Sequence, residues 1–128
     1  MQTLVTRIVL IAVAGAAGTL ARYWLGGLAQ RLTGGLFPWG TFTVNMAGCF
    51  LFGLVWSLAE ERFLLSAEVR IIVLVGFMGA FTTFSTFIFE SGSLMRDSEW
   101  ALVLGNIAIQ NTVGIAMLFL GLAAGRTV

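Results

Sequence analysis

The sequence contains no histidine and no lysine, and it has only one cysteine and one proline among 128 residues. Without histidine it lacks the commonest metal ligand and the commonest proton shuttle of enzymes. Its single cysteine, Cys49, excludes an intrachain disulfide and lies in an apolar run, where a thiol packs as a small hydrophobe. We therefore expect no enzyme built on histidine, on a cysteine cluster or on paired acids.

Charged residues are also scarce, at 10% of the chain against about 25% in soluble domains. The net charge of +1 gives no reason to predict a nucleic-acid partner. Apolar residues make up 59% of the chain, with eleven phenylalanines, and there are sixteen glycines. A small domain has too much surface to hide this much apolar side chain from water. The composition therefore predicts a membrane protein.

Charge-free runs mark where the chain is expected to cross the membrane. No charged residue lies within 32–59, 71–89 or 100–125, and the first apolar run is interrupted by Arg22. About 20 helical residues span the hydrocarbon, and the first run continues past any plausible signal cleavage site. The sequence predicts an all-α membrane protein with one domain, residues 1–128, and four transmembrane helices near 4–30, 40–60, 69–94 and 100–125.

An even number of spans places both ends of the chain on one side of the membrane. Four arginines belong to that side and two to the other: Arg7, Arg62, Arg70 and Arg126 against Arg31 and Arg96. The positive-inside rule places the ends in the cytoplasm. So weak a bias also permits insertion both ways up, and hence an antiparallel dimer; a single orientation stays open. Small residues four apart, such as Gly121 and Gly125, favour a homo-oligomer.

Polar side chains inside the spans are the first candidates for function. Arg22 is costly in a membrane and is a functional candidate by default, although its stem can also reach the interface. Asn45, one turn after Thr41, must face protein or water; the alternative to a functional role is a structural contact between helices. Asn106 and Gln110 share one helix face and predict a polar track.

The third span carries the most unusual stretch, GFMGAFTTFSTFIFE (76–90). Gly76 and Gly79 loosen a helix, and the hydroxyls that follow can bond the backbone in place of the helical ladder: Thr82, Thr83, Ser85 and Thr86. This pattern predicts a broken third helix, which a membrane tolerates only where protein or water surrounds it. Carbonyls exposed at a break bind cations, and half-helix N-termini favour anions.

The phenylalanines of this stretch allow two interpretations. Phe84 and Phe87 are three residues apart and project to one side of a helix. Aromatic ring edges are positive and can contact an anion in a narrow passage, whereas phenylalanines facing lipid are ordinary. Glu90 likewise can be a proton or cation site, or simply a residue at a helix end.

These motifs together resemble the Fluc/CrcB family of fluoride channels. The stretches that carry the resemblance are GAAGTLARYW, WGTFTVNMAGCFLFG and GFMGAFTTFSTFIFE, in that order over nearly the whole chain. The fourth span departs from the family pattern, which usually has Tyr and Ser where this chain has Asn106 and Gln110.

The resemblance implies a passive, fluoride-selective channel that exports cytoplasmic fluoride across the inner membrane and confers fluoride resistance. It implies an antiparallel, dual-topology homodimer with two pores and a structural sodium ion (Na⁺) at its centre, held by the main-chain carbonyls of Gly79 and Thr82. Arg22 would lie at the aqueous vestibule. The pore residues would be Phe84, Phe87, Asn45, Thr41, Ser85, Thr86, Gln110 and Asn106.

Two other functions are weighed against this expectation. A small, dual-topology, proton-coupled multidrug transporter needs a carboxylate in the membrane, and Glu90 is the internal candidate. An assembly or signalling subunit needs a partner surface, but the polar loops are short. Dependence of transport on a proton gradient and on Glu90 distinguishes the first alternative from a channel.

Overall fold

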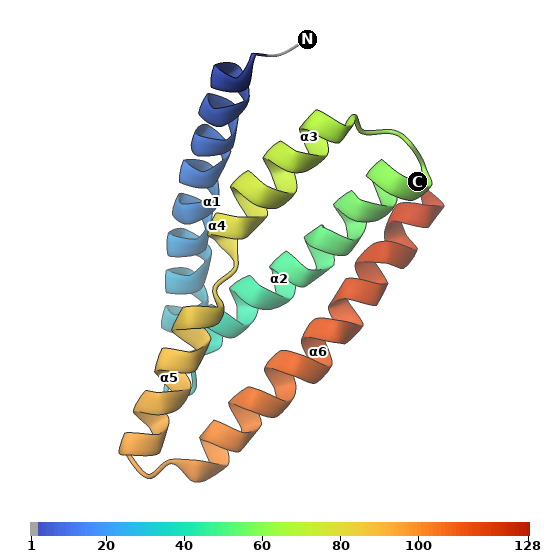
Figure 1. The fold of residues 1–128 in the computed structure, drawn as a ribbon. Coiled ribbons are helices and arrows are strands. Elements are labelled where there is room, and N and C mark those ends of the chain that lie inside the picture. Colours follow the sequence, from blue (N-terminus) through green and yellow to red (C-terminus); the bar gives the residue numbers. More distant parts are fainter. Residues whose placement is uncertain (1–2) are drawn as a thin grey trace.

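The computed structural model describes residues 3–128, and these form helices with no strand (Figure 1). The helices are α1 (Leu4–Thr33), α2 (Trp39–Trp56), the π-helical η1 (Ser57–Glu61), α3 (Ala67–Ile71), the π-helical η2 (Ile72–Met78), α4 (Gly79–Phe81), α5 (Phe84–Arg96) and α6 (Trp100–Thr127). Consecutive helices combine into four apolar spans long enough to cross a membrane: Leu4–Thr33, Trp39–Glu61, Ala67–Arg96 and Trp100–Thr127. The prediction of an all-α protein with four spans is confirmed.

The first connection is held by a side chain of α1. Gly34, with a φ of 66°, ends the helix, and its N–H donates to the carbonyl of Gln30 at 2.9 Å. The amide of Gln30 then donates to the carbonyl of Phe37 at 3.1 Å and accepts from the N–H of Gly40 at 3.0 Å. α1 therefore continues to Thr33, past the expected end near residue 30.

Backbones pack directly against each other where glycines remove the side chain. α2 and α6 lie side by side along their length, and α1 lies along η2 and α4 (Figure 1). A Cβ atom on Gly121 would overlap the carbonyl oxygen of Phe50 in α2, and one on Gly18 would overlap that of Phe77 in η2. Such contacts between backbones are the usual way in which membrane helices associate.

The apolar core lies between α1, α2 and the first half of the third span. Val44, Leu74, Met78 and Phe81 are buried there. Phe77 stacks on Phe81 with ring centroids 5.5 Å apart and an interplanar angle of 19°. This core fixes the third span against α2 up to Phe81, the last residue of α4.

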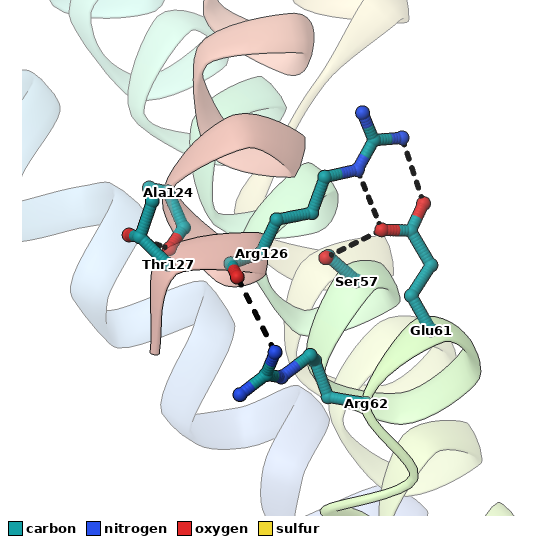
Figure 2. Close-up of polar contacts among 6 residues, drawn as sticks. All are labelled: Ser57, Glu61, Arg62, Ala124, Arg126 and Thr127. Atoms are coloured by element: carbon teal, nitrogen blue, oxygen red, sulfur yellow. Dashed lines mark hydrogen bonds and ion pairs between the residues drawn. The ribbon is translucent and has the colours of Figure 1, made fainter.

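Ion pairs close the end of the bundle at which α1 begins and α6 ends. Arg126 donates to both carboxylate oxygens of Glu61, at 2.7 and 2.9 Å, and buried Ser57 donates to the same carboxylate at 3.0 Å (Figure 2). Arg62 donates to the carbonyl of Arg126 at 3.5 Å. Further pairs at this end are Arg7 with Glu68, and Arg70 with Glu60. The arginines that the sequence assigns to the side of the chain ends lie together.

We predict that Gly121→Ala lowers the free energy of unfolding by about 1–3 kcal/mol, because the added methyl group forces α2 and α6 apart. Gly105→Ala in the same helix is the matched control, since no atom lies within 4 Å of a Cβ placed there. The measurement is unfolding of the purified protein by SDS in mixed micelles, followed by circular dichroism. Equal stability of the two variants would contradict this account of the α2–α6 contact.

Candidate functional site

Two residues of extended backbone separate α4 from α5. Thr82 has φ −83° and ψ 156°, and Thr83 has φ −149° and ψ 109°. The hydroxyl of Thr82 donates back to the carbonyl of Met78 at 3.0 Å, and the hydroxyl of Thr83 caps α5 by accepting from the N–H of Thr86 at 3.2 Å. Both threonines thus use their hydroxyls as local substitutes for helical hydrogen bonds.

Asn45 of α2 holds the extended segment. Its Oδ1 accepts from the N–H of Thr83 at 2.9 Å, and its Nδ2 donates to the carbonyl of the same residue at 3.3 Å. The second hydrogen of Nδ2 is directed to Oε1 of Gln110 at 3.2 Å. A single amide side chain therefore satisfies both backbone groups of Thr83, which the bilayer interior could not do.

This arrangement changes what the neighbouring carbonyls can bind. In a continuous helix, the N–H of Thr83 would donate to Gly79 and that of Thr86 would donate to Thr82. Here these two N–H groups donate to Asn45 and to the hydroxyl of Thr83. The carbonyls of Gly79 and Thr82, the two candidate cation ligands, are thus released from the helical ladder on either side of the same interruption.

A cavity of about 410 Å³, the phenylalanine cavity, lies beside this segment and is lined by Phe84, Phe87, Asn45 and Gln110, among others. The two phenyl rings are neighbours, with centroids 5.7 Å apart and an interplanar angle of 55°. Phe87 is 7% exposed, whereas Phe84 is 74% exposed. The structure thus brings four of the predicted pore residues to one cavity, with one ring packed inside the protein and the other open to its surroundings.

A second cavity of about 620 Å³, the arginine cavity, is lined by Arg22, Thr41, Thr86 and Glu90, among others. The hydroxyl of Thr41 donates to Oε1 of Glu90 at 2.8 Å, while Oε2 of Glu90 is buried and has no hydrogen-bond partner among residues 3–128. Thr83 lines both cavities. The extended segment therefore forms the boundary between an arginine-bearing cavity and a phenylalanine-bearing one.

The remaining predicted site residues lie elsewhere. Ser85 is exposed and lines neither cavity; its hydroxyl lies 3.4 Å from that of Thr83. Asn106 is fully buried, also lines neither cavity, and donates to Ser91 of α5 at 3.0 Å.

Sequence reasoning expected the hydroxyl of Thr83 to bond the backbone, but it missed the bonds between Asn45 and the backbone of Thr83 and the role of Ser91. The position of Ser91 one helical turn after Phe87 is the signal that could have found it, because that spacing lets a hydroxyl reach the carbonyl of Phe87.

Comparison with known proteins identifies the family of the chain. Residues 9–122 match the family model described as CrcB-like protein, Camphor Resistance (CrcB). The chain belongs to the CrcB family. Since residues 9–122 include all the residues named above for the two cavities, the family match covers the whole candidate site.

Several relatives within this family carry one name, "Fluoride-specific ion channel FluC". The chain is 60% identical to that of Solidesulfovibrio magneticus and 57% identical to that of Nitrosococcus oceani, each over 118 residues that cover 92% of this chain and 94% of the relative. It is 51% identical to that of Desulforapulum autotrophicum over 95% of this chain and 98% of the relative. The resemblance to the Fluc/CrcB family is confirmed. A CrcB member with four apolar spans is a multi-pass membrane protein and not an enzyme.

We predict that Asn45→Ala lowers the free energy of unfolding by about 1–3 kcal/mol, because it leaves the N–H of Thr83 without its acceptor inside the protein. Asn111→Ala is the matched control, since that amide is exposed and donates only to Ile107 in its own helix. SDS titration of both variants measures the difference. An Asn45→Ala variant as stable as Asn111→Ala would show that Asn45 does not hold the extended segment.

Proposed function

We propose that this protein is a passive, fluoride-selective anion channel of the inner membrane that exports cytoplasmic fluoride. The observation that carries the proposal is the extended Thr82–Thr83 segment, held by Asn45 between two cavities. A transmembrane helix has no structural reason to be interrupted there, since the interruption must be compensated by a buried amide. The relatives named as fluoride-specific ion channels supply the identity of the anion.

The phenylalanine cavity offers an anion weak positive groups. Ring edges of Phe84 and Phe87 carry partial positive charge. The amides of Asn45 and Gln110 line the same cavity, and Nε2 of Gln110 keeps one hydrogen beyond its bond to Asn106 for an anion. A small, strongly hydrogen-bonding anion gains most from such donors, because they replace its water at short distance. Chloride is larger and gains less. We therefore assign these four residues to the pore.

The arginine cavity serves in this proposal as the aqueous vestibule. The guanidinium of Arg22 attracts anions, against the carboxyl groups of Glu90 and Asp97 in the same cavity. The hydroxyls of Thr41 and Thr86 line the route toward the extended segment. Ser85 lies on the exposed side of α5, next to Thr83. In this proposal Ser85 contributes its hydroxyl on the side of α5 that a second subunit covers.

We further propose that two copies assemble in antiparallel orientation to form two pores. Phe84 is 74% exposed although it lines the phenylalanine cavity, so a neighbouring chain is needed to complete the wall of a closed passage. The weak arginine bias permits both insertions. The end of the bundle at which α1 begins and α6 ends also carries Glu60, Glu61 and Glu68, which form ion pairs with the arginines there.

A structural sodium ion at the centre of the dimer fits the backbone of the interruption. The carbonyls of Gly79 and Thr82 are free of the bonds that a continuous helix would give them. Nothing lies closer than 3.9 Å to a Cβ placed on Gly79, so its surroundings are open. Carbonyl oxygens are suitable ligands for a hard monovalent cation. Two copies would contribute the same carbonyls from each side, and the bound ion would join the two interruptions.

Export needs no energy source of its own. Hydrogen fluoride enters uncharged and ionises in a less acidic cytoplasm, and an inside-negative potential drives the anion out with about 2.3 kcal/mol per 100 mV. The alternative, a proton-coupled multidrug transporter, would use Glu90 as its membrane carboxylate. Glu90 lines the arginine cavity beside Thr41, but the relatives' names do not favour that alternative.

We predict that purified protein in liposomes releases fluoride at least tenfold faster than chloride under the same potassium gradient with valinomycin. The physical reason is the narrow passage with donors matched to a small anion. Ion-selective electrodes measure both rates, with protein-free liposomes as the blank. Chloride release as fast as fluoride release would end the claim of selectivity, and release only under a proton gradient would favour the transporter.

Two phenylalanine variants connect this flux to the cavity. Phe84→Ile is expected to slow fluoride release because it removes a ring edge from the phenylalanine cavity. Phe119→Ile is the matched control: it is 64% exposed on α6 and lines neither cavity. Equal rates of fluoride release in the two variants would show that Phe84 is an ordinary lipid-facing residue and not part of the pore.

A further inference from the structure

Four hydrogen bonds run in one direction from Asn45 to the backbone of α5. Asn45 donates to Gln110 at 3.2 Å, and Gln110 donates to Asn106 at 3.4 Å. Asn106 donates to the hydroxyl of Ser91 at 3.0 Å, and Ser91 donates to the carbonyl of Phe87 at 2.8 Å. Aligned hydrogen bonds of this kind polarise and strengthen one another. The row starts at the side chain that holds Thr83 and ends on a phenylalanine of the cavity.

Two members of this row, Asn106 and Ser91, are buried away from both cavities. Asn106 is 0% exposed and Ser91 is 3% exposed. Neither lines the phenylalanine cavity or the arginine cavity. Burying an amide and a hydroxyl inside a membrane protein costs free energy unless they bond each other. The Asn106–Ser91 bond between α6 and α5 therefore needs an explanation other than direct contact with the ion.

The position of α5 explains what such a role would be. The extended Thr82 and Thr83 uncouple α5 from α4, so helical continuity does not fix where α5 lies. α5 packs mainly on α6 and makes few contacts with α2. The part of α5 that lines the phenylalanine cavity must then be held in place by hydrogen bonds to neighbouring helices. The Asn106–Ser91 bond joins α6 to α5 within one turn of Phe87.

We propose that Asn106 and Ser91 are positioning residues that set the placement of the Phe87 ring, and through it the discrimination between fluoride and chloride. They act through the backbone of α5 and never contact the anion. The inference rests on the proposed function for its selectivity readout, and on the hydrogen-bonded row alone for the placement of Phe87. Discrimination responds to small displacements because it depends on the width of the passage and the distance of its donors.

The variants Ser91→Ala and Asn106→Leu, singly and together, test the proposal. Ser91→Ala removes one oxygen atom and leaves the helical hydrogen bonds of α5 in place, so folding is retained. Thr112→Ala is the matched control on α6: its exposed hydroxyl bonds only Ala108 in its own helix, and it lines neither cavity. Two readouts are taken: the ratio of fluoride to chloride release, and the ¹⁹F NMR shift of 4-fluorophenylalanine incorporated at position 87.

We expect each single variant to lower the release ratio about 3- to 10-fold, the effect of one net hydrogen bond. We also expect each to move the ¹⁹F signal, and the double variant to do less than the sum of the two single effects, since both variants break the Asn106–Ser91 bond. Thr112→Ala should leave both readouts as in the wild type. A ¹⁹F signal unchanged by Ser91→Ala, whatever the flux, would overturn the proposal, as would additive effects in the double variant.

The two proposals fail separately. A wild-type protein that releases no fluoride would refute the proposed channel function, and the ¹⁹F shift would then decide alone whether Ser91 and Asn106 place Phe87. A selective wild type with an unmoved ¹⁹F signal in both single variants would keep the channel and refute the positioning role.

Discussion

The structure depends on one requirement: backbone N–H and C=O groups within a bilayer must find partners other than lipid. Thr82 and Thr83 leave the helical ladder, and the amide of Asn45 satisfies both backbone groups of Thr83 from the neighbouring α2. We expect that, without that amide, the third span would return toward a continuous helix. The separation of two cavities, the released carbonyls of Gly79 and Thr82, and the independence of α5 all follow from this contact.

The same contact explains the pattern of residues in α2. Asn45 and Gly48 are three apart and share a helix face. A Cβ atom on Gly48 would overlap Cγ2 of Thr82, so a side chain here would have to displace Thr82 from its place beside Asn45. The stretch TVNMAG therefore combines a polar group with the space that it needs. A glycine elsewhere in this helix could not serve the same purpose.

Hydropathy and charge predicted the four spans, because the cost of placing charge in lipid fixes depth in the membrane. They could not predict which way a side chain points around the helix axis. Asn106 and Gln110 illustrate this: they share one helix face and bond each other, but hydropathy could not predict that Gln110 lines the phenylalanine cavity while Asn106 bonds Ser91. The partner of Asn45 was equally hidden, since nothing local in the sequence relates residue 45 to residue 83. The π-helical η1 and η2 have no counterpart among the sequence predictions, which treat these stretches as parts of the second and third spans.

The most direct test of the account is the backbone conformation of Thr82 and Thr83 in a lipid bilayer. Solid-state NMR of isotopically labelled protein gives their ¹³Cα and ¹³Cβ shifts relative to random-coil values, which distinguish extended from helical backbone. The account predicts lowered ¹³Cα and raised ¹³Cβ shifts at both residues, and a return toward helical values when Asn45 is replaced by leucine. Helical shifts at both threonines in the unmodified protein would contradict the central claim.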